Sequence, residues 1–582
     1  MDDQAASEAA RTLLKRALLA GMAALFVLIV AAMQILGYGG AIERDTALPA
    51  FFAMKQDIPV GTLVLAALVG WWLRLDRHRP APVFRFGLKD WQAGAILLAM
   101  ALGIWGLRAG ILPDYDLSRD EKMVGFDAAI FAGGHLFAPI PPFWRDFYDA
   151  LNINFVLPIG DREAWVSNYL PGNAALRALL GMVMPASAIG AVLVLAGGAA
   201  LWRIAARLWP ESPSTRAVVL VLYAASSQVI LTGTTTFAMS AHLTANLVWL
   251  WLFLQRRPLA HAGAIAVGFI ATGLHQPLFH PLFVAPFLLL LLRERAWKEL
   301  AAYASCYLAI GLFWIGWQPW LSAQGLHPVP AALHTEGADY VTRLRGAFRA
   351  PSLLTLWVMA GNLLRFVTWN ALPLLPLAAV TLLTPLRSGR FVQALWLGLA
   401  GMVLLMAAIL PWQGYGWGYR YLHGYIGSLV LLAGYGWRWL EERQAAPHRA
   451  LIVLTALSFM LLLPLHVWMA GGHIHAYAAA SARIRAIGAD VVIVDDGVPF
   501  AQDLVFNRAD LSNRPIMLEH SYVRWSSLPA LCRGRTLGFA DAPLLAPVTD
   551  FFGLARPSAP SSHQQATKSA ARAAGCRIVP VP

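Results

Sequence analysis

The stretch "ALLAGMAALFVLIVAAMQIL" (residues 17–36) contains no charged side chain, and it follows the cations Arg11, Lys15 and Arg16. Because a helix needs about 20 apolar residues to cross a bilayer, this stretch is long enough to span a membrane. A cleaved signal peptide would have a shorter apolar core and a small-residue cleavage site. The stretch is therefore expected to form a retained first membrane helix.

The composition of the whole chain agrees with this start. Of the 582 residues, 58% are hydrophobic and only 13% are charged, whereas soluble domains contain about 25% charged residues. The net charge of +13 is concentrated in short loops between apolar runs, a pattern that reports membrane topology. No nucleic-acid motif accompanies it. The sequence predicts an all-α polytopic membrane protein.

Counting apolar runs against the basic loops predicts thirteen spans, with a cytoplasmic N-terminus and an extracytoplasmic C-terminus. The segment 352–369 is ambiguous. If it crossed the membrane, the basic loop 385–390 would lie outside, so we expect an interfacial or re-entrant helix there. The predicted spans are residues 17–36, 59–73, 91–110, 183–203, 214–232, 237–255, 260–274, 279–293, 299–320, 370–386, 392–410, 421–438 and 450–470.

The chain divides into three predicted parts. Residues 1–90 form a helical hairpin and a basic cytoplasmic loop, and residues 91–470 form the transmembrane domain with a large exterior loop at 111–182. Residues 471–582 change character, because short buried strand patterns bounded by turn residues alternate there with helical ones. We expect a small extracytoplasmic α/β domain. It has no GxGxxG or P-loop, so we interpret it as a lid or packing domain. The strand patterns lie at residues 489–497, 514–520, 535–541 and 576–582.

Three cysteines occur in the chain. Cys306 lies in a predicted span and is interpreted as an inert apolar residue. Cys532 and Cys576 lie in the predicted exterior domain, where oxidation is permitted. They are a candidate disulfide, although spacing alone leaves free thiols equally open.

Acidic residues gather in "YDLSRDEKMVGFDAAIFAGGHLFAPIP" (residues 115–141), directly after a predicted span. Carboxylates near a membrane surface are costly unless they have a partner or a task. Asp120 and Glu121 are the main candidates. Adjacent residues on a helix point about 100° apart, so one of them can face a cavity while the other orients a neighbour. The alternative is an ordinary polar loop in which Asp114, Asp116 and Asp127 serve as linker charges or a helix cap.

The stretches "SRDEKMVGFDAAIFAGGHLFAP" (118–139) and "SNYLPGNAALRALLG" (167–181) resemble motifs of the GT-C glycosyltransferases. This group includes protein O-mannosyltransferases and aminoarabinose transferases. The resemblance covers most of residues 90–440 in layout, but two predicted spans precede the loop-bearing helix where many members have one. It implies a GT-C-like fold, a polyprenyl-phosphate-linked sugar as donor and a bacterial-type inner membrane as location. Asp120 would act as general base in an inverting transfer, with Tyr169 in the second motif.

A cation is needed to hold the donor phosphate. In "PWQGYGWGYRYLHG" (411–424), Arg420 stands between Tyr419 and Tyr421, which resembles a Gly-x-Arg-Tyr motif before a late GT-C span. Arg345, in "YVTRLRGAFR", is an alternative phosphate contact. The competing interpretation is that aromatic residues with one arginine only anchor the chain at the membrane interface.

The stretch "GLHQPLFHP" (273–281) places His275 and His280 at a predicted exterior turn. They could contact an acceptor or a metal, but their spacing across a proline is not that of a helical ligand pair. No metal ligands are assigned, and a divalent cation stays open as a partner of the phosphate.

Two other functions remain open at this stage. A transporter or flippase for a lipid or polysaccharide precursor would carry charged residues within spans and repeat-like halves, and neither is evident. A non-catalytic membrane assembly protein would use the exterior domain to bind a partner. The acceptor of a transferase could be a protein, a lipid or a glycan.

Overall fold

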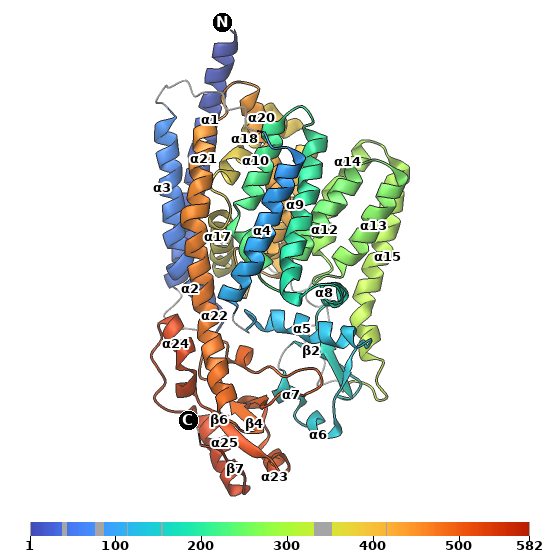
Figure 1. The fold of residues 1–582 in the computed structure, drawn as a ribbon, viewed down its shortest axis with the longest axis vertical. Helices are drawn as coiled ribbons and strands as arrows, with labels where there is room; N and C mark the ends of the chain where they lie inside the picture. Colours follow the sequence, from blue (N-terminus) through green and yellow to red (C-terminus); the bar gives the residue numbers. More distant parts are fainter. Residues whose placement is uncertain are drawn as a thin grey trace.

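The computed structural model describes residues 2–37, 44–75, 87–112, 115–152, 155–330, 352–414 and 416–580. Most helices run lengthwise through one body, and a smaller mixed region covers one end of it (Figure 1). The N-terminus lies at one end of the molecule and the C-terminus at the other. We call these the N-terminal end and the C-terminal end. Arg345 and most of the basic loop 75–90 lie outside the described residues.

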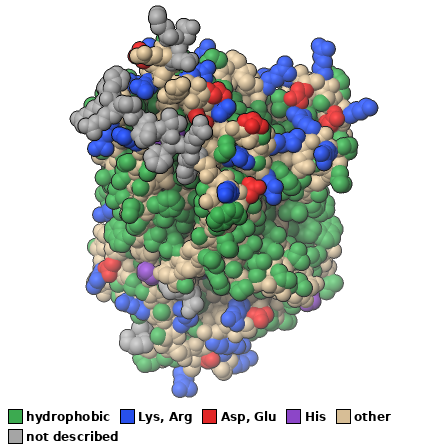
Figure 2. Space-filling model, turned by 45° about the horizontal axis from the view of Figure 1, so that its top comes forward, with side chains coloured by type: hydrophobic (Ala, Val, Ile, Leu, Met, Phe, Trp, Pro, Cys, Tyr) green, Lys and Arg blue, Asp and Glu red, His purple; other side chains and the backbone are tan. Residues whose placement is uncertain are grey.

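The long helices identify a polytopic membrane protein. Among the described residues, seven helices are long and apolar enough to cross a membrane, and a pair bent by 54° makes an eighth. Figure 2 shows a band of apolar side chains between two zones in which charged side chains gather. The seven are Gln4–Gly37, Leu48–Arg74, Asp90–Ile111, Ala186–Leu208, Trp297–Ser322, Arg390–Ile409 and His448–Ala486.

Shorter helices occupy the other predicted span positions. The helices of the body are α1 (Asp2–Gly37), α2 (Arg44–Phe52), α3 (Ile58–Arg74), α4 (Asp90–Ile111), α9 (Ile189–Leu208), the bent pair α10 (Pro213–Ala224) and α11 (Ser227–Gly233), α12 (Met239–Leu254), α13 (Pro258–Thr272), α14 (Phe279–Arg293), α15 (Trp297–Ser322), α17 (Leu353–Thr368), α18 (Leu374–Leu383), α19 (Arg390–Ile409), α20 (Ile426–Glu441), α21 (His448–Leu457) and α22 (Leu463–Ala486).

The segment 352–369, for which an interfacial or re-entrant helix was expected, lies within the body. It forms α17, which runs antiparallel along α1: Gly361 lies beside Ile35, whereas Phe366 shares a cavity wall with Leu25. After a break around Pro373, α18 continues along α1. The two helices therefore form one broken path through the body. This arrangement keeps the loop 385–390 at the N-terminal end, which is what the charge rule required.

The exterior loop folds into small elements at the C-terminal end. Three short antiparallel strands pair in the order β1-β3-β2, and Asp127 of α5 accepts hydrogen bonds from the backbone N–H and hydroxyl of Ser167 in β3. The elements are α5 (Arg119–Ala132), β1 (Ala138–Pro139), α6 (Pro142–Arg145), α7 (Tyr148–Leu151), β2 (Val156–Ile159), β3 (Ala164–Ser167) and α8 (Gly172–Gly181).

The C-terminal residues contain the predicted small α/β region. Its four strands are all parallel, in the order β5-β4-β6-β7, and the two inner strands are almost wholly buried, as parallel strands usually are. A disulfide joins Cys532 to Cys576, whereas Cys306 is free. The elements are β4 (Val491–Val494), β5 (Ile516–Glu519), α23 (Leu528–Cys532), β6 (Thr536–Ala540), α24 (Ala546–Phe552), α25 (Ser562–Ala573) and β7 (Arg577–Ile578).

Two contacts fix this region to the rest of the chain. Residues His448–Ala486 form one continuous helical stretch that leaves the body and enters the C-terminal region, so the boundary expected at residue 470 falls inside a helix. In addition, Phe126 and Trp165 of the exterior loop share an apolar cluster with Ile493 and Phe539 of the sheet. The segment 115–181 and the C-terminal region therefore pack as one layer at the C-terminal end, which we call the outer layer.

Candidate functional site

Helix α5 carries the acidic pair into the junction between the body and the outer layer. Its N-cap residue, Ser118, makes no side-chain cap bond. Instead, Asp503 of η7 (Ala501–Leu504) accepts a hydrogen bond from the Arg119 backbone N–H at 3.2 Å. The backbone carbonyl of Asp503 also accepts from Tyr115 at 2.8 Å and from Lys122 at 2.5 Å. A residue almost 400 positions away thus supplies the cap that orders the first turn of α5.

Asp120 and Glu121 point to different partners, as their adjacent helical positions require. Glu121 is fully buried and accepts hydrogen bonds from the backbone N–H groups of Leu117 at 2.6 Å and Thr236 at 2.5 Å. Burial and the nearby charge of Asp116 raise the pKa of Glu121 to about 7. Glu121 therefore ties α5 to the turn after α11 and does not face the same space as Asp120.

Asp120 joins three segments that are distant in sequence. Its carboxylate accepts a hydrogen bond from the Tyr169 hydroxyl at 2.7 Å and pairs with Nη1 of Arg420 at 2.9 Å. Burial opposes ionisation of Asp120, but the Arg420 charge and the two hydrogen bonds outweigh it and hold the carboxyl pKa below its usual range. Asp120 is therefore ionised at neutral pH.

Arg420 is held by the turn that its glycine-rich sequence forms. Gly416 lies against the arginine side chain, where a Cβ would clash, and Gly418 adopts a φ of +68° that favours glycine. Gln413 accepts a hydrogen bond from the Arg420 backbone N–H at 2.9 Å. The guanidinium lies 4.8 Å from the centre of the Phe237 ring. These contacts explain why the loop needs glycines on both sides of its aromatic residues.

The Arg420 guanidinium keeps unused donor capacity. Its Nε is buried and makes no hydrogen bond within the described residues. Arg420 also borders a small cavity. Because a guanidinium offers five N–H donors in a fixed plane, Arg420 can hold Asp120 and still donate to an anion. The other lining residues are Met239, His242, Asn246, Phe279, Tyr421, Gly424 and Tyr425.

The predicted histidines separate into two environments. His275 stacks on Tyr169, with ring centres 4.9 Å apart, and its buried Nδ1 has no hydrogen-bond partner within the described residues. Burial lowers the pKa of His275 to about 4, so its ring is neutral beside Asp120. His280 lies within the body, where its two ring nitrogens contact Asn246 and Tyr307 at 2.8 Å each. His275 is therefore part of the site, and His280 supports the helices.

The structure brings together five of the residues predicted from sequence: Asp120, Tyr169, His275, Arg420 and Tyr421. Glu121 and His280 lie elsewhere, as described above. The Tyr419 side chain is also elsewhere, buried in the body with its hydroxyl 3.7 Å from the sulfur of Met359. Local sequence patterns did not identify Asp503 or Gln413, because their roles depend on contacts that form only in the folded chain.

Comparison with known proteins adds the following. No family model and no curated protein sequence matches the chain. Two solved structures of ArnT from Cupriavidus metallidurans are similar to it, each with 11% sequence identity. The apo structure gives a TM-score of 0.46 over 73% of this chain and 85% of that one. The structure bound to undecaprenyl phosphate gives 0.47 over 83% and 89%.

Proposed function

We propose that this chain is an integral membrane glycosyltransferase. It would move a sugar from a polyprenyl-phosphate donor to an acceptor hydroxyl at the C-terminal end of the molecule, on the extracytoplasmic side. The observation that carries the proposal is the contact of Asp120 with Arg420 and Tyr169 at the junction of body and outer layer. It combines an ionised carboxylate with a cation that has donors to spare beside a cavity.

The two charged residues supply what a displacement at the anomeric carbon needs. Asp120 takes the proton of the acceptor hydroxyl as the acceptor oxygen bonds to the anomeric carbon. The bond from that carbon to the phosphate oxygen breaks, with inversion, and the lipid phosphate leaves as an anion. Arg420 holds the phosphate charge. Little acid catalysis is required, because the leaving group is already a stable anion.

The ion pair also prepares the base. Before the donor binds, Arg420 keeps Asp120 in its ionised form, although this contact weakens the carboxylate as a base. When the guanidinium turns toward a donor phosphate, burial of Asp120 dominates and its pKa rises. Tyr169 keeps the carboxylate in place during this exchange. The base thus becomes stronger at the moment when the donor is bound.

The distribution of basic residues supports the proposed orientation. The loops that join the helices at the N-terminal end carry cations, and the positive-inside rule places such loops in the cytoplasm. The candidate site lies at the other end, where a lipid-linked sugar on the outer leaflet would meet it. These cations include Arg207 in the last turn of α9, and Arg256, Arg295, Arg387 and Arg443 between α-helices.

The test compares Asp120→Asn with Asp116→Asn in a strain that lacks the gene. Asp116 is a matched control, because it lies in the same loop and pairs with Arg108 at 3.6 Å, away from the cavity. Mass spectrometry of envelope glycolipids and glycoproteins should show a sugar-bearing species restored by the unchanged protein and by Asp116→Asn. Asp120→Asn should lower its rate of formation about 10²–10⁴-fold at equal membrane abundance. If Asp120→Asn restored the sugar-bearing species at the unchanged rate, Asp120 would not be the base.

A further inference from the structure

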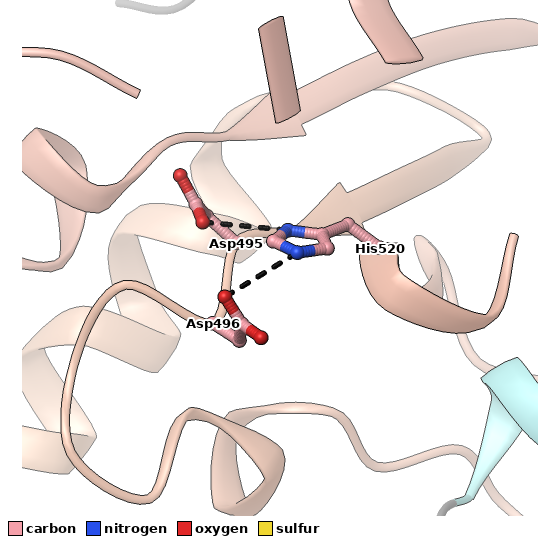
Figure 3. A group of neighbouring side chains, drawn as sticks. All are labelled: Asp495, Asp496 and His520. Atoms are coloured by element: carbon pink, nitrogen blue, oxygen red, sulfur yellow. Dashed lines mark ion pairs between the residues drawn. The ribbon is translucent and has the colours of Figure 1, made fainter. Parts of the chain in front are cut away.

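A second cluster of polar side chains lies in the C-terminal sheet. Asp495 and Asp496 directly follow β4, and His520 directly follows β5, so parallel pairing of these strands brings all three to one edge (Figure 3). The strand order β5-β4-β6-β7 sends the chain to one side of β4 and then to the other. In open α/β sheets, ligands bind outside the carboxyl ends of the strands at such a change of direction.

The distance between His520 Nε2 and Asp496 fits two ligands of one metal ion better than a hydrogen bond. The His520 side chain is 2% exposed, with Nδ1 3.3 Å from Asp495 Oδ1 and Nε2 3.3 Å from Asp496 Oδ1. Asp495 faces the ring from the Nδ1 side, whereas the 3.3 Å between Nε2 and Asp496 is longer than a charge-assisted hydrogen bond of about 2.7–2.9 Å. Two ligands of one tetrahedral ion with bonds near 2.0–2.2 Å lie about 3.3–3.5 Å apart.

The carboxylates of Asp495 and Asp496 differ in their hydrogen bonding and in their exposure to solvent. Asp495 is buried and accepts hydrogen bonds from the backbone N–H groups of Gly497, Ala542 and Ser561. Asp496 is 35% exposed and faces Nε2. A metal-bound histidine commonly uses its second nitrogen to contact an orienting carboxylate. Asp495 is placed for that orienting role, and Asp496 leaves the ion a path from solvent.

We propose that His520 Nε2 and Asp496 bind a divalent transition-metal ion, with Asp495 orienting the imidazole. A mixed imidazole and carboxylate set suits Zn²⁺. The ion joins the ends of β4 and β5 and fixes the start of the segment that contains Asp503, the cap of α5. This proposal does not rest on the proposed transferase activity.

The experiment measures zinc in the full-length protein in detergent. The protein is stripped with EDTA, incubated with ZnCl₂, desalted and measured by inductively coupled plasma mass spectrometry. About one zinc ion per chain is expected for the unchanged protein and for His327→Gln, which alters an exposed histidine paired with Glu163 instead. His520→Gln and Asp496→Asn should lose the ion, and Asp495→Asn should weaken its binding about 10–100-fold.

Two results would overturn the proposal: no zinc above background in the unchanged protein, or equal zinc in His520→Gln. Size-exclusion profiles verify that each variant is folded. X-ray absorption of the zinc-loaded unchanged protein provides a test that needs no variant. Nitrogen and oxygen ligands including imidazole support the site, and sulfur ligands would place the zinc at cysteines and contradict it.

Discussion

Two carboxylate–arginine pairs with little exposure to solvent differ in their geometry. Arg365 of α17 donates two hydrogen bonds to Asp57, at 3.0 and 2.6 Å. The side chains of Arg365 and Asp57 are 3% and 1% exposed. Arg420 contacts Asp120 through one nitrogen at 2.9 Å, and the side chains are 5% and 20% exposed. The first pair lies among the membrane helices, and the second lies at the junction with the outer layer.

The two arginines differ in the hydrogen-bond donors that they leave unused. Nε of Arg365 is bonded to Asp57, whereas Nε of Arg420 has no hydrogen-bond partner within the described residues. Small cavities adjoin each pair, so a cavity alone does not distinguish them. A closed bidentate pair serves the fold, and a partly exposed pair with a free donor can exchange its partner for a ligand. The following experiments test that distinction.

The largest expected effect is the loss of stability in Arg365→Gln. This change leaves Asp57 buried without its partner, and breaking a buried pair costs about 3–5 kcal/mol. Thermal unfolding in detergent should show a clearly lower midpoint. The double variant Asp57→Asn/Arg365→Gln should recover part of the loss, because no uncompensated charge remains. An unchanged midpoint in Arg365→Gln would show that the pair does not support the fold.

Arg420→Gln should act mainly on the reaction. Removing the cation that stabilises the leaving phosphate should slow sugar transfer about 10²–10³-fold, with a smaller loss of thermal stability than in Arg365→Gln. Arg420→Lys is the matched control, because it keeps the charge but loses the planar donors, and an intermediate rate is expected. The measurement is product formation at equal membrane abundance. If Arg420→Gln unfolded as readily as Arg365→Gln without a specific loss of rate, the pair would be structural.

The sequence predicted features that depend on local pattern. The apolar runs located the helices, and the alternation of strands and helices located the C-terminal sheet. Motifs in three separate segments pointed to Asp120, Tyr169 and Arg420, whose side chains are in contact. Predictions were incomplete where distant contacts decide the role. The pairing of Glu121 with Thr236 depends on how α5 packs on the body.

The proposed metal site also depends on contacts between distant parts of the sequence. Asp496 and His520 become neighbours only through the parallel pairing of β4 and β5. The sequence did contain a signal for this site, because Asp496 and His520 both stand at the end of an apolar strand pattern. Using it would have required knowing that these two strands are adjacent in the sheet, which periodicity does not specify.

A smaller effect is expected from the cap of α5. Asp503→Ala removes the acceptor for the Arg119 N–H and should cost about 1–2 kcal/mol of stability. Sugar transfer should fall about tenfold, because Asp120 is in the first turn of α5 and a small misplacement of a reacting group is costly. Asp503→Asn keeps an accepting oxygen and should recover much of the rate. Asp510→Ala, which removes an exposed local acceptor for Ser512, is the control. Equal rates in Asp503→Ala and Asp510→Ala would show that the outer layer does not position the base.

The smallest expected effect is a shift in pH dependence in Tyr169→Phe. Arg420, Tyr169 and His275 face Asp120, and its pKa is lowered in the folded protein, with burial opposed by the Arg420 charge and the hydrogen bonds. A lowered pKa means that the contribution of Asp120 to stability is fully present above its unfolded value, near 3.9, and is lost as the pH falls through the folded value. The Asp120–Arg420 pair therefore stays charged from pH 5 to 8.

Because the carboxylate is the proposed base, the acid limb of the kcat profile should follow the raised pKa that Asp120 has once Arg420 turns to the donor phosphate. Tyr169→Phe removes one hydrogen bond to the carboxylate, so the acid limb should move to higher pH by less than about one unit, equivalent to less than about 1.4 kcal/mol. The profile is measured for transfer between pH 4 and 8. Tyr148→Phe is a control, because its hydroxyl is buried in the outer layer and makes no contact with Asp120. Identical acid limbs in Tyr169→Phe and the unchanged protein would mean that the titrating base is a different group, even if Arg420 still binds the donor.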